Sequence, residues 1–287
     1  MLSKCRNCLS TASLSRHLND DHILRCSACG AFQYTGPLES VAGLYTEKYF
    51  KGAEYVNYEL AAPVFRRNFI SKLDLIRKQA PDLPVSEMRV LEIGSATGDF
   101  MEVLQKAGVG AVLGVEASEF ARQRSVERGF SVLDPFAKDY LEQVRAFRPN
   151  VICAWDVWEH IEHPGDVFAA LLEQNPSIVV VAISTVDSGA LVPRLNGKKW
   201  RQFHPPTHLN YPTKKSFAVF FHSLGFEVSV NKPVGYYRPL ADYLSVFLPS
   251  EWLNSMPKLF KVPLYLNLFD IQLVIATKRQ EQLRKAV

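Results

Sequence analysis

Long apolar runs are absent from this chain of 287 residues. A helix that spans a bilayer needs roughly 18 or more consecutive apolar residues, whereas the longest clean run, Ile178 to Ile183, is far shorter. The first ten residues, MLSKCRNCLS, also lack the apolar stretch of a secretory signal peptide. We therefore expect no transmembrane segment and a cytoplasmic protein, in which cysteines are thiols or metal ligands rather than disulfides.

An excess of one charge is absent as well. The chain has 33 Lys and Arg against 29 Asp and Glu, a formal net charge of +4. Binding to nucleic acid would require the basic residues to be clustered in a patch. The composition, 47% hydrophobic and 22% charged, is that of a globular protein, and the length suits one large core with a small accessory module. We expect a small-molecule partner rather than a nucleic acid.

Cysteine is scarce, but its spacing is informative. Four of the five cysteines lie within the first 30 residues, as two C-x2-C pairs separated by 17 residues. This spacing predicts a zinc ribbon over residues 1–35, in which four thiolates close a tetrahedron around a structural Zn²⁺. A redox pair would need a βαβ context that is missing here, and Cys153 lies in an apolar run that suits a buried core residue. The expected ligands are Cys5, Cys8, Cys26 and Cys29.

From residue 88 onward, apolar runs alternate with amphipathic stretches, which predicts an α/β fold with a doubly wound, mostly parallel sheet of seven strands. A linker and an amphipathic helix over 57–79 fill residues 36–80, and the core occupies 81–287 with an insertion at 232–270 before the last strand. The expected strands are 88–93, 111–116, 130–133, 150–154, 177–184, 226–231 and 271–277, and the expected core helices are 98–107, 118–128, 138–147, 165–174 and 213–224.

The stretch VLEIGSATGDF, from Val90 to Phe100, forms a glycine turn after the first core strand. Its glycines are four apart, so the dinucleotide fingerprint G-x-G-x-x-G is not present. Glu92 precedes the turn and could bind an amine, and Glu116 ends the second strand, where a carboxylate accepts hydrogen bonds from a ribose diol. One acid for an amine and one for a ribose favour S-adenosylmethionine over NAD.

These motifs resemble those of a known family. VLEIGSATGDF and GVEAS resemble the first two signature motifs of class I S-adenosylmethionine-dependent methyltransferases, and PNVICAWDVWEHIEHPGDVF resembles their fourth-strand segment. WRQFHPPTHLNYPTKKSFAVFFHSLGFEV resembles a segment of one subgroup, in which a four-cysteine zinc ribbon and a YxxxYF linker, here LYTEKYFKG, often precede the core. The resemblance implies a Rossmann-like methyltransferase fold and methyl transfer from S-adenosylmethionine.

The resemblance also implies which residues surround the cofactor. Ala96 departs from the family pattern, which usually has a middle glycine there. Asp134 would reach the adenine amine, or it is only a turn residue before Pro135, and Trp155 would flank the cofactor or belong to the core. The cofactor residues implied by position are Glu92, Gly94, Ser95, Ala96, Gly98, Phe100, Glu116, Ala117, Asp134 and Trp155.

Methyl transfer often needs a base to take the proton of the acceptor, and histidine titrates near neutrality. Three histidines are candidates on loops at the carboxyl edge of the sheet: His160, His204 and His208. Each could instead lock its loop by hydrogen bonds. Glu159 and Asp156 could orient an imidazole or act as the base themselves. No Asn-Pro-Pro-Tyr motif follows the fourth strand, which argues against methylation of a nucleobase nitrogen.

We expect methyl transfer to a small-molecule acceptor, in particular O-methylation of a sugar or secondary metabolite. The alternatives are an RNA methyltransferase that binds RNA through its ribbon, and a cofactor-binding protein without turnover. The basic run RLNGKKWR, residues 194–201, is either a solvated loop or a site for an acidic substrate. The aromatic, apolar insertion at 232–270 is a lid, a face for homo-oligomers, a patch for a lipid-linked acceptor, or part of the core.

Overall fold

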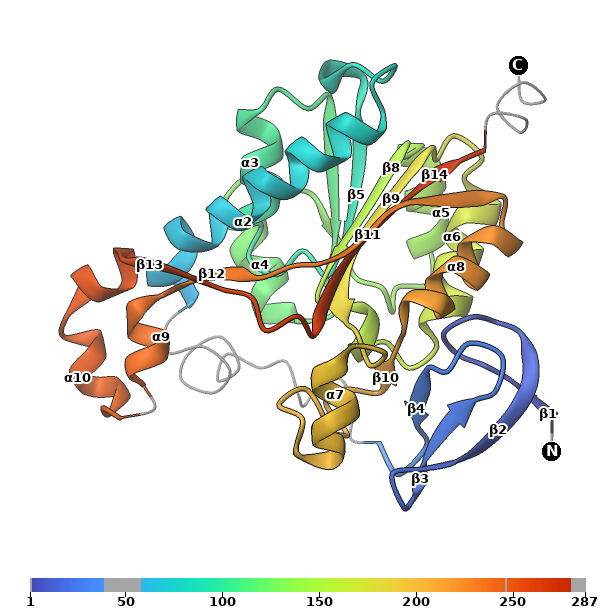
Figure 1. Cartoon of the computed structure of the whole chain (residues 1–287). Helices are drawn as coiled ribbons and strands as arrows, with labels where there is room; N and C mark the ends of the chain where they lie inside the picture. Colours follow the sequence, from blue (N-terminus) through green and yellow to red (C-terminus); the bar gives the residue numbers. More distant parts are fainter. Residues whose placement is uncertain (1, 39–57, 246, 280–287) are drawn as a thin grey trace. The chain divides into compact units, whose positions relative to one another are not determined.

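The computed structural model describes residues 2–38, 58–245 and 247–279 (Figure 1). The LYTEKYFKG motif, at residues 44–52, and most of the expected linker lie outside the described residues. The chain forms two compact units. Unit 1 comprises Met1–Leu38, Leu141–Val234 and Leu268–Val287, and unit 2 comprises Glu39–Tyr140 and Gly235–Asn267. The segment expected to form the ribbon thus groups with later parts of the chain, while the domain boundaries expected at residues 35 and 80 stay a prediction.

Unit 2 contains three parallel strands in the order β5-β6-β7. Helices connect them, because parallel neighbours need a crossover: α3 packs on β6 and α4 packs on β7. All three strands therefore end at the same edge, so the turns after β5 and β6 lie together. The bounds are β5 Arg89–Ile93, α3 Asp99–Lys106, β6 Ala111–Val115, α4 Glu119–Glu127 and β7 Val132–Leu133, with a short η2 at Val85–Glu87.

The part of the insertion that belongs to unit 2 folds onto helix α2 (Tyr58–Gln79), which also packs on α3. A hairpin of two antiparallel strands, β12 and β13, encloses three short helices. Their buried side chains share one apolar core with Phe65 of α2 and Ala121 of α4. Core packing is therefore one role of the insertion. The bounds are β12 Tyr236–Pro239, α9 Leu240–Leu244, α10 Ser250–Asn254, η5 Pro257–Lys261 and β13 Pro263–Leu266.

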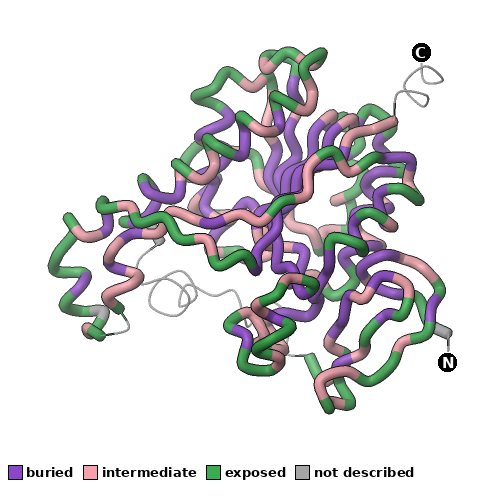
Figure 2. Tube along the Cα trace, in the orientation of Figure 1, coloured by how far each residue is buried: buried purple, intermediate pink, exposed green. Residues whose placement is uncertain are grey.

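Unit 1 contains four of the expected core strands, in the order β11-β14-β9-β8. β8 and β9 are parallel, and β14 is antiparallel to both β9 and β11. Every residue of β8 and β9 is buried (Figure 2), as continuous apolar runs in a parallel sheet require. The bounds are α5 Tyr140–Phe147, β8 Val151–Trp155, α6 Pro164–Gln174, β9 Val180–Val186, α8 Lys214–Ser223, β11 Phe226–Pro233 and β14 Ile271–Lys278.

The N-terminal segment of unit 1 forms a separate antiparallel sheet, in the order β1-β2-β3-β4-β10. The last strand comes from far along the chain, and Phe32 of β4 pairs with Tyr211 of β10. The ribbon edge is thus completed by the segment that carries two of the candidate histidines. The bounds are β1 Leu2–Lys4, β2 Thr11–His17, β3 Asp20–Cys26, β4 Phe32–Tyr34, η3 Trp158–His160, α7 Leu191–Asn196, η4 Gly197–Lys199 and β10 Asn210–Tyr211.

Each of the seven strands expected for the core is present, three in unit 2 and four in unit 1. Among their described pairs, the two that involve β14 are antiparallel and the others are parallel. The mostly parallel α/β architecture expected from the sequence is confirmed. Within the described residues, none of the helices has the length and apolar character that crossing a membrane demands.

Candidate functional site

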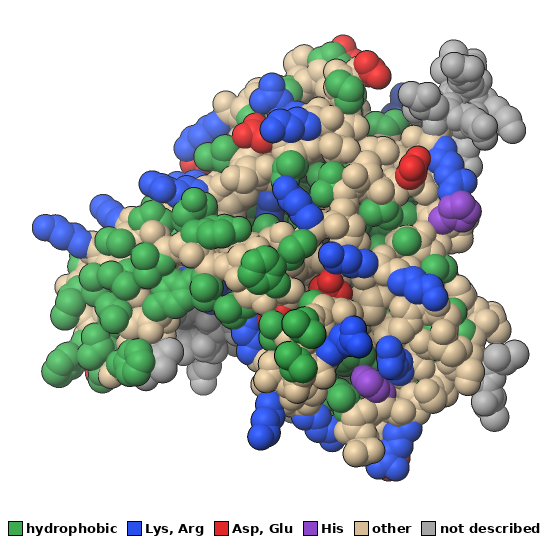
Figure 3. All heavy atoms as spheres, viewed as in Figure 1, with side chains coloured by type: hydrophobic (Ala, Val, Ile, Leu, Met, Phe, Trp, Pro, Cys, Tyr) green, Lys and Arg blue, Asp and Glu red, His purple; other side chains and the backbone are tan. Residues whose placement is uncertain are grey.

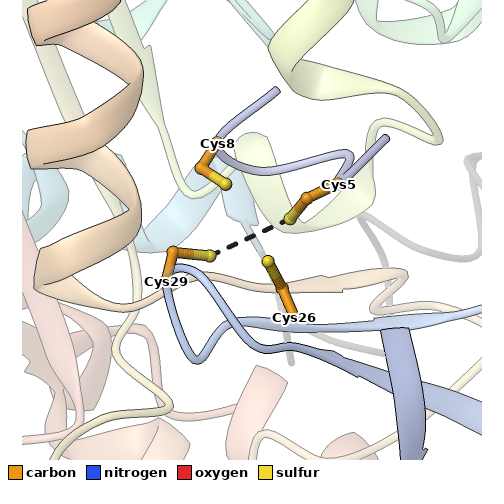
Figure 4. Close-up of side chains that lie close together, drawn as sticks. All are labelled: Cys5, Cys8, Cys26 and Cys29. Atoms are coloured by element: carbon orange, nitrogen blue, oxygen red, sulfur yellow. Dashed lines mark hydrogen bonds between the residues drawn. The ribbon is translucent and has the colours of Figure 1, made fainter. Parts of the chain in front are cut away.

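The four N-terminal cysteines converge in unit 1. Their side chains come from two tight turns and point toward one another (Figure 4). All four are buried, their sulfur atoms lie within 4.8 Å of one another, and the Sγ atoms of Cys5 and Cys29 are 3.9 Å apart. The cluster is compatible with a structural zinc ion.

The turns that carry these cysteines are fixed to the segment between residues 158 and 213. Asn7 lies between two of the cysteines: its Oδ1 accepts a hydrogen bond from Trp158 Nε1 (2.9 Å), and its Nδ2 donates to Asn210 Oδ1 (3.3 Å). Thr213 Oγ1 donates to the carbonyl of Cys29 (2.8 Å). The ribbon is therefore bound directly to both loops that carry the candidate histidines.

The three candidate histidines meet in unit 1. His160 ends η3, the short helix that follows β8, and the other two are the first and last residues of the HPPTH loop. The ring centroids of His160 and His208 are 4.7 Å apart, and those of His204 and His208 are 3.8 Å apart. His208 is buried, His160 is half-buried and His204 is exposed. The sequence indicated each histidine separately, and the fold brings them into one cluster.

Backbone carbonyls fix the tautomers of the two inner rings. His160 Nδ1 lies 2.9 Å from the carbonyl oxygen of Thr207, and His208 Nδ1 lies 2.9 Å from that of Gln202. A carbonyl oxygen can only accept, so each Nδ1 carries the proton. In the neutral ring the lone pair is then on Nε2. Both rings are thus held as Nδ1–H tautomers with a basic Nε2.

Burial keeps these inner rings neutral. It lowers the pKa of His160 to about 4, assisted by the charge of His204 and opposed by the Thr207 carbonyl. Burial, and then repulsion from His160 and His204 in their protonated forms, lowers the pKa of His208 well below its usual value. A buried imidazole loses hydration on protonation, which explains both shifts. His160 and His208 are therefore neutral, weakly basic groups at physiological pH.

The two acids of the same loop differ in environment. Glu159 is buried, and its Oε2 accepts a hydrogen bond from Thr185 Oγ1 at 2.7 Å. Asp156 has a positive φ of 57°, and its Oδ1 accepts a hydrogen bond from Ser184 Oγ at 3.2 Å. One ligand atom from each of Glu159, His160 and His208 lies within 4.8 Å of the others. Sequence analysis suggested that Glu159 orients an imidazole or acts as a base, and this role stays a prediction.

In unit 2 the glycine turn has the expected backbone. Gly94 and Gly98 have φ of 71° and 83°, a region that glycine enters without strain. A Cβ on Gly98 would lie 2.9 Å from the ring of Phe130. Ala96, where the family usually has glycine, also has a positive φ of 45°. The turn thus keeps a glycine-like backbone despite the departure in sequence.

Glu116 connects this turn to the loop after β6. Its Oε2 accepts a hydrogen bond from the N–H of Ala96 (2.9 Å), and its Oε1 accepts one from the N–H of Ser118 (2.8 Å). Burial raises its pKa, although these backbone bonds oppose the shift. Each carboxylate oxygen has a second lone pair. Glu116 can therefore organise both loops and still accept hydrogen bonds from a diol.

Glu92 is a buried acid at the end of β5. Among the described residues, its Oε2 has no hydrogen-bond partner. Burial and the nearby charges of Asp99 and Glu116 raise its pKa well above the usual value, while Lys72 opposes the shift. Asp99 differs, because Arg66 and Arg128 pair with it. Glu92 is thus the acid of this group that a cationic ligand would stabilise.

The other implied cofactor residues have varied surroundings. Asp134 accepts hydrogen bonds from Arg122 (3.2 Å) and from the N–H of Phe136 (2.9 Å), which is the geometry of a turn residue. Arg122 also donates to the carbonyl of Ala117, a bridge that the sequence did not reveal. Three more of the implied cofactor residues are buried. Phe100 packs against Phe69, Ser95 lies next to Gly114, and Trp155 is the last residue of β8 in unit 1.

Two further sequence features have clear places. In the basic run, Arg201 forms two hydrogen bonds with buried Asp270 (2.7 and 3.0 Å), and Lys198 pairs with Asp20 of the ribbon. In unit 2, exposed apolar side chains gather around α10 and β13 (Figure 3), among them Trp252, Leu264 and Tyr265. A homo-oligomer formed through residues 232–270 stays a prediction, and this apolar surface would be its interface.

A family comparison decides the enzyme class. Residues 58–229, more than half of the chain, match the family model described as "Methyltransferase domain". This chain belongs to the methyltransferase domain family. The enzyme class expected from the glycine turn and the two acids is therefore confirmed. A search of the curated proteins gives no significant match.

Solved structures similar to this methyltransferase include three from different organisms. An S-adenosylmethionine-dependent methyltransferase from Archaeoglobus fulgidus has 19% identity and a TM-score of 0.48, covering 81% of this chain and 97% of that chain. Magnesium protoporphyrin IX methyltransferase from Synechocystis PCC 6803, with bound SAH, has 14% identity and a TM-score of 0.47, covering 80% of this chain and 91% of that chain. A possible histamine N-methyltransferase from Thermotoga maritima has 18% identity and a TM-score of 0.44, covering 77% of this chain and 94% of that chain. Likeness this distant indicates nothing about the acceptor.

Proposed function

We propose that this methyltransferase transfers the methyl group of S-adenosylmethionine to a hydroxyl of a small molecule, such as a sugar or a secondary metabolite. The cofactor is the one named for the Archaeoglobus protein. When bound, it supplies an electrophilic methyl group. The residues of this chain have to bind it, orient the acceptor and receive the proton that the acceptor loses.

The single observation that carries the proposal is the pair of acids around the glycine turn. Glu92 is buried with a carboxylate oxygen that lacks a hydrogen-bond partner in the described part of unit 2. A bound ammonium group would satisfy that oxygen, because a buried charge is stable only when it is compensated. Glu116, which already holds the turn through Ala96, has lone pairs left for a ribose diol. These residues fit the amino and ribose groups of the cofactor.

The histidine cluster supports a base for a hydroxyl acceptor. His204 is the exposed member, and its ring is 3.8 Å from that of His208. A histidine open to solvent can reach an acceptor and then release the proton to water. His160 and His208 are held by backbone carbonyls and line the cluster behind it. We assign His204 the role of general base in this proposal.

The four cysteines support a structural zinc ion. Each sulfur is buried, and the four ligand atoms lie together, so a bound Zn²⁺ would have no open position for chemistry. Its role would be to hold Asn7 and Cys29 in place against Trp158, Asn210 and Thr213. In this proposal the ribbon is a scaffold for the histidine loop.

Contacts of the basic side chains in the ribbon do not favour an RNA-binding role. Lys4 pairs with Asp166, Arg6 with Glu162, and Arg16 with Asp21. Arg25 donates to the carbonyl of Gly30. Side chains that are already paired with acids offer phosphate less attraction than a free basic patch. The ribbon surface therefore supports scaffolding over RNA binding.

The test is methyl incorporation from labelled S-adenosylmethionine into a panel of hydroxylated small molecules, with total RNA as a parallel acceptor. We expect a small-molecule product, and we expect His204→Ala to lower turnover by roughly 10²–10⁴-fold while cofactor affinity is retained. His163→Ala is the matched control, because His163 is exposed outside the cluster. If RNA alone is methylated and the reaction is sensitive to salt, the proposal is wrong and the protein is an RNA methyltransferase. If the cofactor binds but no acceptor is methylated, the protein is non-catalytic.

A further inference from the structure

A second cluster of metal-binding side chains lies in unit 1, separate from the four cysteines. It comprises Glu159, His160 and His208. One ligand atom from each side chain lies within 4.8 Å of the other two, a distance over which one ion could contact all three. Two of the three come from the turn after β8, and the third comes from the HPPTH loop.

The imidazoles are oriented as metal-binding histidines are. In metal sites the non-ligating ring nitrogen usually donates its proton to a carbonyl or carboxylate, which fixes the tautomer and the ring. Here His160 Nδ1 donates to the Thr207 carbonyl and His208 Nδ1 donates to the Gln202 carbonyl, each at 2.9 Å. A cation bound by the two rings would therefore contact their Nε2 atoms, as the proposal below requires.

The carboxylate is held in the same way. Thr185 Oγ1 donates to Glu159 Oε2 at 2.7 Å, so a neighbouring strand residue orients the acid. Glu159 is buried, with 2% of its surface exposed, and a carboxylate in that position is stabilised by a compensating positive charge. A divalent ion between Glu159 and the two imidazoles would supply this charge.

We propose that Glu159, His160 and His208 bind one divalent first-row transition-metal ion, with Thr185 as a positioning residue. Two imidazoles and one carboxylate suit such ions and leave coordination positions open to water or to an acceptor oxygen. This site is distinct from the cysteine cluster, which offers four sulfurs and no open position. The exposed His204 lies beside it, with its ring 3.8 Å from that of His208.

The test uses Mn²⁺ alone, because the thiolate cluster favours softer ions. The loss of the free Mn²⁺ signal in electron paramagnetic resonance, measured on the full chain, gives the stoichiometry and the affinity. We expect one saturable Mn²⁺ per chain, displaced by Zn²⁺. His208→Ala and Glu159→Gln should weaken binding by at least about tenfold, and His163→Ala should leave it unchanged.

A ligand variant could also fail to fold, so Thr185→Val provides a second route. It keeps all three ligands and removes only the hydroxyl that orients Glu159, and we expect roughly 10-fold weaker Mn²⁺ binding with an unchanged circular dichroism spectrum. The proposal is overturned if the wild-type chain binds no Mn²⁺, or if wild type, Glu159→Gln and Thr185→Val bind it equally. Those results would leave the cluster as a hydrogen-bonded loop lock.

Discussion

The two units assemble their candidate sites differently. In unit 2 the residues expected to bind the cofactor run from Glu92 to Asp134, within three consecutive strand–loop segments. Parallel strands end at one edge, so residues close in sequence come together. In unit 1 the candidate metal-binding and catalytic residues extend from Cys5 to His208, and they come together through contacts between distant segments. A local motif therefore indicates the first site, whereas the second exists only because the ribbon, η3 and the HPPTH loop are fixed to one another.

The distant contacts of unit 1 have identifiable causes. β4 of the ribbon pairs with β10, and the ring of Phe32 stacks on that of Tyr211 with centroids 4.5 Å apart. The side chain of Asn7 forms hydrogen bonds with both Trp158 and Asn210. Buried polar groups such as these are costly when they are left unpaired. The ribbon and the histidine loop should therefore gain or lose their order together.

The largest expected effect tests that dependence. Cys26→Ser removes one of four buried ligands, and we expect bound zinc to fall from about one per chain to near zero. The free energy of unfolding should fall by about 4 kcal/mol or more, as is typical when a metal is lost. Elemental analysis measures the zinc, and denaturation followed by tryptophan fluorescence, to which Trp158 contributes, measures the stability.

Cys153→Ala is the matched control for this experiment. Cys153 is a buried cysteine in β8, away from the cluster, so zinc should be retained. A wild-type chain purified without chelator that contains no metal would rule out the structural zinc. Full zinc content in Cys26→Ser would show that the four cysteines are not the ligands.

The next effect tests the local character of unit 2. Gly98→Ala places a Cβ at a φ of 83°, 2.9 Å from Phe130 Cδ2 and 3.2 Å from Ser125 Oγ. We expect a loss of about 2–4 kcal/mol, the sum of backbone strain and overpacking. Gly108→Ala is the control, because Gly108 has a φ of 79° with nothing within 4 Å, and it should lose only about 1–2 kcal/mol. Equal losses in urea denaturation would mean that close approach at Gly98 is unimportant.

Much of the fold was predictable because its signals are local. The strand expected at 271–277 is β14 (Ile271–Lys278), and the one expected at 226–231 is β11 (Phe226–Pro233). Apolar runs and helical periodicity determine such elements. The strand expected at 130–133 is shorter, Val132–Leu133. So short a strand at the edge of a sheet has too few residues for its hydrophobic pattern to define its ends. The hairpin of β12 and β13 was not expected, since its pairing depends on α2 and its surrounding core.

The site was predictable to the same extent. Sequence spacing indicated the four cysteines and the glycine turn. It could not show that His160 and His208, separated by 47 residues of chain, meet around Glu159, because loop conformations decide that contact. Nor could it show that Arg122 connects Ala117 and Asp134. The roles of the individual cofactor-site residues and of the histidines stay predictions.

The smallest effect concerns the charge of Glu92. In the free protein, burial and the charges of Asp99 and Glu116 raise the pKa of Glu92 well above its usual value, so below that raised pKa the carboxyl is protonated. A bound ammonium favours the ionised form and lowers the pKa. Binding of S-adenosylmethionine should therefore release a proton from Glu92. Calorimetry in buffers of different ionisation enthalpy measures this release directly.

The sign of the pH dependence follows from that release. Below the raised pKa of Glu92, affinity should increase with pH by up to about tenfold per unit, or about 1.4 kcal/mol, and it should level off above it. Measurements below about pH 7.5 keep the α-amino group of the cofactor protonated. Glu116 also has a raised pKa, so Glu92→Gln is needed to separate the two acids. This variant should bind more weakly and release no proton. If it releases as many protons as the wild type, the ammonium does not bind at Glu92. The cofactor site predicted in unit 2 would then depend on Glu116 and the glycine turn.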